Sequence, residues 1–127
     1  MRMTRLLQAL LACFAVAAAA HHSTANFDRT RESTITGKVS YFGFTNPHSF
    51  IDLEVTDPAS GAVQPYKVFL PGRVLLARYD WKPGDLKAGD TVTLTGFPDR
   101  KDAKFLYMSR IRFASGKNWV RSEQIPE

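Results

Sequence analysis

The strongest constraint on the fold is a period of two in the hydrophobicity of the chain, which recurs in segments separated by turn-forming residues. In residues 50–56, the apolar side chains of Ile51, Leu53 and Val55 alternate with polar or acidic ones. This alternation is typical of a β-strand that buries one face and exposes the other to water. The pattern therefore favours a β-rich domain over a helical one.

Five segments of the 127-residue chain have the composition of strands. In the first, the alternation predicts that Ile35, Val39 and Tyr41 face the core, and in the last it predicts the same of Tyr107 and Ile111. Pro71 and Gly72 end the third segment, and a short helix is expected directly after them. The five strands are predicted at residues 33–41, 50–56, 64–70, 91–97 and 105–113, the helix at 73–79, and an irregular tail from Ala114.

This order of elements is that of a small OB-fold barrel, in which five strands close on themselves. Gly37 and Gly96 lie inside the first and fourth strands, where a barrel needs bends. We therefore predict a mainly β fold, a five-stranded OB-fold-like barrel with one short helix between strands three and four. An open five-stranded sheet with one helix would give almost the same sequence pattern.

Residues 1–20 are predicted to be a secretory signal peptide. Two arginines, Arg2 and Arg5, precede an apolar stretch that ends in small residues. The stretch is shorter than the ~20 residues that span a bilayer, so no transmembrane segment is expected after cleavage. Removal of both arginines would lower the formal charge from +5 to +3 and leave a single domain, residues 21–127, that is periplasmic or secreted.

Two features of the leader leave its processing open. Cleavage before His21 and cleavage before Ala20 both satisfy the preference for small residues. Cys13 also ends an imperfect lipoprotein box, Leu-Leu-Ala-Cys, and lipidation there would anchor the protein. That route would leave an apolar start to the mature chain, so cleavage near Ala20 is preferred. Cleavage there also removes the only cysteine.

The histidines His21, His22 and His48 are the candidate metal ligands. Cleavage before His21 would give this residue a free α-amine beside its imidazole, and His48 would add a third nitrogen. Cleavage before Ala20 would instead place His22 third in the chain, where an amine, two amides and an imidazole form a planar chelate. Nitrogen-rich sets of this kind suit Cu(II), so both routes predict a copper-like ion.

A candidate binding face surrounds His48. Phe50 and Asp52 share its parity in the strand, and Asn46 lies at the turn before it. Asp52 is expected to lie near enough to orient His48. The aromatic residues predicted on the outer face are Phe42, Phe44, Phe50 and Phe69.

The expected partner is an envelope protein, an envelope polysaccharide or a small ligand. Export and a charge of only +3 make a nucleic-acid partner unexpected. No nucleophile elbow, phosphate-binding loop or paired-carboxylate motif is present, so an enzyme is not expected. The predicted function is thus an exported binding or accessory protein that holds a copper-like ion. The alternative is a metal-free interaction module that uses its outer aromatic face.

The motifs His21-His22-Ser23 and Asn46-Pro47-His48, with the Gly-Asp turn that ends at Asp90, resemble a widespread family of small exported bacterial proteins of unknown function. The resemblance implies export and a small β-barrel but no activity, and its motif positions in this chain are His21, His22, Asn46, Pro47 and His48. Family members usually carry a tryptophan or another bulky residue after Asn-Pro-His, where this chain has Phe50. The helical segment 72–79 is less typical of the family.

Overall fold

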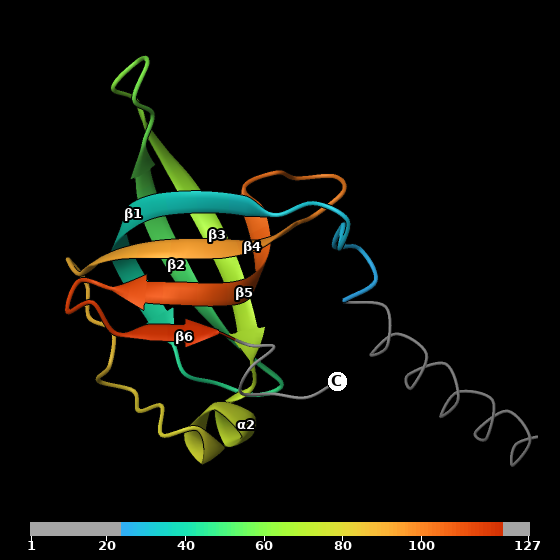
Figure 1. Cartoon of the computed structure of the whole chain (residues 1–127), viewed down its shortest axis with the longest axis vertical. Helices are drawn as coiled ribbons and strands as arrows, with labels where there is room; N and C mark the ends of the chain where they lie inside the picture. The colour runs from blue at the N-terminus through green and yellow to red at the C-terminus, as the bar shows by residue number, and fades with distance from the viewer. Residues whose placement is uncertain (1–23, 121–127) are drawn as a thin grey trace, which may run out of the picture.

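A computed structural model of the chain describes residues 24–120 (Figure 1). The predicted signal peptide, Cys13, His21 and His22 lie outside these residues. Six strands and one short helix follow one another along the described chain. They are β1 (Ser33–Gly43), β2 (His48–Thr56), β3 (Val63–Pro71), α2 (Arg73–Arg78), β4 (Thr91–Pro98), β5 (Phe105–Phe113) and β6 (Asn118–Val120).

The sheet closes into a barrel of five strands. Its order is β3-β2-β1-β4-β5-β6, and β3 also pairs with β5. This closing contact is parallel and joins residues 67–69 to residues 105–107, whereas the other ladders are antiparallel. Closure removes most of the exposed sheet edge. The predicted OB-fold-like barrel, with its helix between the third and fourth strands, is confirmed.

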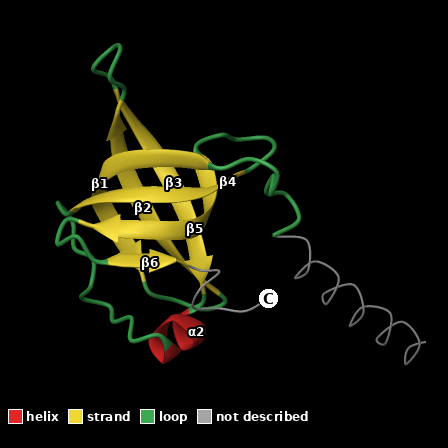
Figure 2. Cartoon of the chain, in the orientation of Figure 1, coloured by secondary structure: helices red, strands yellow, loops and turns green. Residues whose placement is uncertain are grey.

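The inner faces of the strands form one hydrophobic core. Ile51 and Leu53 of β2 point inward as their alternation predicts, and Leu76 of α2 closes one end of the barrel, where Figure 2 shows the helix. The side chains exposed by no more than 1% are those of Ile51, Leu53, Val68, Leu70, Leu76, Leu94, Leu106, Met108 and Ile111, with Ser49. Such dense burial replaces the disulfides that the described chain lacks.

A bulge in β1 reverses the alternation of its second half. The register against β2 shifts between Val39 and Tyr41, so Ser40 and Tyr41 both face solvent and Tyr41 is 54% exposed. The prediction that Tyr41 faces the core is therefore wrong. Beyond the bulge, Phe42 and Phe44 pack against the core. They do not belong to the outer aromatic face to which the sequence pattern assigned them.

A second irregularity lies in β5. Thr95 pairs with Arg110 and Gly96 with Met108, which leaves Ser109 as an extra residue. Parity therefore changes at Ser109. Ile111 is in the core as predicted, whereas the ring of Tyr107 packs against Phe27 instead of sharing the core face with Ile111.

The tail after Ala114 is not irregular throughout. A turn at Gly116, whose φ is +86°, brings residues 118–120 back to pair with residues 110–112 as β6. The side chain of Trp119 in this strand is buried against the core. Within residues 24–120, no helix has the length and apolarity needed to cross a membrane.

Candidate functional site

The Asn-Pro-His motif forms a tight corner between β1 and β2. The Asn46–Pro47 peptide bond is cis. The Thr45 hydroxyl donates a 2.8 Å hydrogen bond to the backbone carbonyl of His48, and the buried Ser49 hydroxyl lies 3.2 Å from both the amide and the carbonyl of Thr45. These bonds fix the direction in which His48 leaves the corner.

The corner also holds the start of helix α2. The N-cap residue of this helix is Gly72, which has no side chain to satisfy the free amides of the first turn. Asn46 supplies the missing acceptor, because its Oδ1 accepts a 3.3 Å hydrogen bond from the amide of Val74. The amide of Arg73 donates to the Thr45 carbonyl at 2.8 Å. Asn46 therefore has a structural role at a helix 28 residues away.

Gly72 allows this close approach. A Cβ atom at this position would collide with the backbone carbonyl oxygen of Pro47 and would lie 2.8 Å from Asn46 Oδ1. Only a residue without a side chain fits between the corner and the helix. The Asn-Pro-His corner and α2 thus form one packed unit.

The imidazole of His48 is half-buried and stacks on Phe69 of the neighbouring strand. The ring centroids lie 5.6 Å apart and the planes differ by 18°. Neither ring nitrogen has a hydrogen-bond partner among residues 24–120. Within this part of the chain, both nitrogens of His48 are therefore available to a ligand.

Phe69 connects His48 to the segment that precedes β1. The ring of Phe27 lies 6.3 Å from that of Phe69, 5.2 Å from that of Phe105 and 5.5 Å from that of Tyr107. Phe27 is 3% exposed, so this ring is inserted into the outer wall of the barrel. The N-terminal segment is thus anchored beside the strand that carries the partner of His48.

Backbone hydrogen bonds fasten the same segment to the loop after β4. The amide of Asp28 donates to the carbonyl of Pro98 at 2.8 Å, and the amide of Arg100 donates to the carbonyl of Asn26 at 3.0 Å. Phe27 itself forms an isolated antiparallel bridge with Asp99. The ring contacts of Phe27 and the backbone hydrogen bonds of Asn26 and Asp28 therefore fix the same segment of the chain.

Asp28 closes the turn that leads into β1. Its Oδ1 accepts hydrogen bonds from the hydroxyl and the amide of Thr30 at 2.6 and 3.1 Å, and its Oδ2 pairs with Arg31 at 3.0 Å. The hydrogen bond that the Thr30 hydroxyl donates to the Asp28 carboxylate is the largest of the effects that hold the pKa of Asp28 below its ordinary value of 3.8. The turn is therefore most firmly held when Asp28 is ionised.

The other residues of the candidate binding face have partners within the barrel. Lys67 forms a 2.6 Å ion pair with Asp52, and its Nζ lies 4.3 Å from the centroid of the Phe50 ring. Phe50 also packs on Tyr41, at a centroid distance of 5.6 Å. Four positions along an extended strand correspond to about 13 Å. The strand therefore separates Asp52 from His48, and Asp52 is paired with Lys67 instead of orienting the imidazole.

Among residues 24–120, no group of three or more His, Cys, Asp or Glu side chains is arranged to hold a metal ion. The predicted set of His21, His22 and His48 depends on two residues outside this range. Of the three predicted ligands, the structure therefore describes His48 alone. It also describes Phe27, which fixes the chain a few residues after His22.

Three features of the site could not be found from the residues near the motif. Phe27 is a single aromatic residue before the first strand, and nothing in its neighbourhood indicates insertion beside Phe69. Lys67 lies within the predicted third strand, but its pairing with Asp52 requires the β2–β3 register. The capping role of Asn46 requires the packing of α2 on the corner.

The closed five-stranded barrel with a helix between β3 and β4 places the protein among the OB-fold proteins. The chain belongs to the family of unknown function DUF6152, whose sequence profile matches residues 9–106. No curated protein matches the sequence.

Comparison with solved structures shows a likeness in fold to a single-stranded DNA-binding protein. The mitochondrial single-stranded DNA-binding protein Rim1 from S. cerevisiae has 12% identity and a TM-score of 0.51, and the match covers 66% of this chain and 93% of Rim1. A ZRD-deleted mutant of TiaS in complex with agmatine has 14% identity and a TM-score of 0.49, with 68% of this chain and 22% of TiaS covered. At these identities the likeness concerns the fold alone.

Proposed function

We propose that the protein is an exported, single-domain accessory protein that binds a Cu(II)-like ion through His21, His22 and His48. The observation that supports this proposal is the position of Phe27. The centroid distances through Phe69 put the His48 ring within about 12 Å of the Phe27 ring. Residues 24–27 form a turn that the Phe27 amide closes on the Thr24 carbonyl, which spans about 7 Å. The two peptide units from Thr24 to His22 add a reach of about 7 Å at most. The chain is therefore long enough for a shared site.

The chemistry of the donors supports the same proposal. Imidazole nitrogens suit copper, and the ring nitrogens of His48 have no competing hydrogen bonds among residues 24–120. Cleavage before His21 would add an α-amine that chelates together with the His21 imidazole. Phe69 would hold the His48 ring in one orientation, which reduces the entropy lost on binding.

The test is a Cu(II) titration of exported protein whose N-terminus has been established by intact mass. The matched variant is His48→Phe, because phenylalanine keeps an aromatic ring on Phe69 and removes both nitrogens. Loss of an outer-shell partner alone typically costs 10–100-fold in metal affinity, so loss of a ligand should weaken binding by at least about tenfold. The electron paramagnetic resonance spectrum should lose the couplings of one nitrogen.

A second preparation tests the other end of the site. Four extra residues without histidine before His21 would displace the α-amine and leave neither histidine third in the chain, where the planar chelate forms. The barrel would be unchanged, and Cu(II) affinity should fall again. Equal affinity in the starting protein, the His48→Phe variant and the extended protein would contradict the three-histidine site. That result would favour the metal-free interaction module, for which the outer face offers the exposed Tyr41 packed on the half-buried Phe50.

A further inference from the structure

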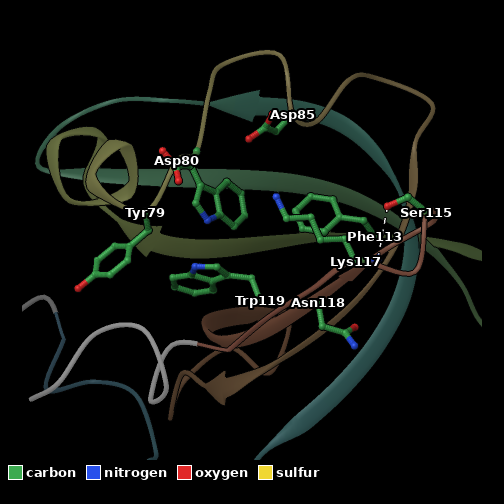
Figure 3. Close-up of a pocket in the computed structure, with 9 residues that line it drawn as sticks. Tyr79, Asp80, Asp85, Phe113, Ser115, Lys117, Asn118 and Trp119 are labelled. Carbon is green, nitrogen blue, oxygen red and sulfur yellow. Dashed lines mark hydrogen bonds between the residues drawn. The ribbon is translucent and has the colours of Figure 1, made fainter.

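A second site lies between the turn after α2 and the β5–β6 hairpin, away from the histidine motif in the sequence. It is a pocket of about 330 Å³ with four aromatic side chains in its walls, those of Tyr79, Trp81, Phe113 and Trp119 (Figure 3). The Trp81 ring lies 5.6 Å from Phe113, at an interplanar angle of 54°, and 5.6 Å from Trp119, at 87°. We call this cavity the two-tryptophan pocket.

One wall of the two-tryptophan pocket carries a hydrogen-bond donor that is not used. Trp119 is only 4% exposed, and its buried indole Nε1 has no acceptor within residues 24–120. Figure 3 shows this nitrogen on the upper edge of the ring, on the same side as Asp80. A buried N–H without a partner is costly to leave unsatisfied. A ligand that offers an oxygen acceptor would remove this cost.

Charges of both signs surround the same space. Lys117 lines the pocket with its amino end turned toward it, and Asp80 and Asp85 lie on the opposite rim (Figure 3). Neither Lys117 nor Asp80 has an ion-pair partner among residues 24–120. The Asp85 carboxylate accepts a 2.9 Å hydrogen bond from the amide of Lys82, which fixes its position.

We propose that the two-tryptophan pocket binds a small zwitterion of the betaine class, in which a quaternary ammonium and a carboxylate share one short chain. Aromatic faces attract methylated ammonium groups, and Asp80 and Asp85 add negative charge on that side. The carboxylate would accept from the indole N–H of Trp119 and pair with Lys117. A neutral sugar would accept a hydrogen bond from the indole N–H of Trp119. It would offer no charge to pair with Lys117 or with the two aspartates.

The test uses the intrinsic fluorescence of the mature protein titrated with glycine betaine. The sequence has two tryptophans, and both line this pocket, so the signal reports on this site alone. The expected result is a saturable change with glycine betaine. Choline lacks the carboxylate and acetate lacks the ammonium, so each should require a concentration about tenfold higher or more, equivalent to one lost charge contact.

The decisive variant is Lys117→Gln, because this exposed side chain can be changed without opening the core. It should weaken glycine betaine binding about tenfold and leave choline binding unchanged, whereas the exposed Lys101→Gln control should change neither. The proposal is overturned if glycine betaine gives no saturable signal, if it binds no better than choline, or if both lysine variants behave alike. Binding of methyl glucoside in its place would also overturn it.

Discussion

Asp28 shows how one carboxylate can organise the segment that precedes the barrel. Its hydrogen bonds to Thr30 close the turn directly after Phe27, the residue that anchors this segment beside Phe69. Because the pKa of Asp28 is lowered in the folded protein, its contribution to stability is present above the ordinary pKa of 3.8. The contribution is lost as the pH falls through the lowered folded value.

The substitution Thr30→Val tests this arrangement. Valine has nearly the same shape but lacks the hydroxyl, which is the main cause of the shift, so the pKa of Asp28 should rise toward 3.8. Carboxyl chemical shifts in a pH titration measure this change. Asp57 is the internal control, because its pKa is lowered by the amides of Ala59 and Ser60 and should not move. An unchanged Asp28 midpoint would contradict the role of the hydroxyl.

At the scale of elements, helix α2 is too short to be stable by itself and depends on its contact with the corner. Leu76 buries one side of the helix, and Asn46 caps its first turn from another part of the chain. The Asn-Pro-His corner therefore positions two things at once, the helix and the His48 ring. A change in the corner should affect both.

Replacement of Asn46 by alanine should lower the free energy of unfolding by about 1 kcal/mol, the usual cost of losing a helix cap. Urea denaturation measures the loss. Asn46→Asp is the matched control, since a carboxylate retains the acceptor near the positive end of the helix and should preserve most of the stability. If both variants lose the same amount, the 3.3 Å bond to Val74 is not what stabilises the helix.

The alternation of the sequence predicted the five long strands. The break at Pro71 and Gly72 predicted the helix, and the order of elements favoured the barrel, although an open sheet has almost the same pattern. The alternation failed where an element departs from regular geometry. The bulge at Ser40 reverses the faces of Tyr41 and Phe42, and no feature of residue type marks it. Strand β6 has only three residues, too few to show a period of two.

The candidate site was predictable only in part for a similar reason. The sequence identified Asn46 and His48, because motif residues stand out locally. The contacts of His48 with Phe69, and of Phe69 with Phe27, join segments far apart in the chain. Such contacts follow from strand register and barrel closure, and neither can be read from neighbouring residues.

At the scale of the whole molecule, stability depends on the closure of the barrel between β3 and β5. Val68 and Leu106 are register partners in this contact, and neither side chain is exposed. The same ladder includes Phe69, Phe105 and Tyr107, the three rings that contact Phe27. Barrel closure and the anchoring of the N-terminal segment are therefore coupled.

The substitution Leu106→Ala should lower the free energy of unfolding by about 2–5 kcal/mol, because it removes buried methyl groups and leaves a cavity. Val63→Ala is the control on β3, since Val63 is 58% exposed and surface changes usually stay within about 0.5 kcal/mol. Denaturation curves of the two variants provide the comparison. Similar losses in both would show that the closing contact does not dominate stability.

Strand β5 divides its pairing between two neighbours. Residues 105–107 close the barrel against β3, whereas residues 110–112 hold β6 and, with it, Trp119. Detachment of β6 would break its own short ladder and expose the buried Trp119, but it would leave the ring of five strands intact. Of the walls of the two-tryptophan pocket, the one that bears Trp119 is therefore the one whose displacement does not open the barrel.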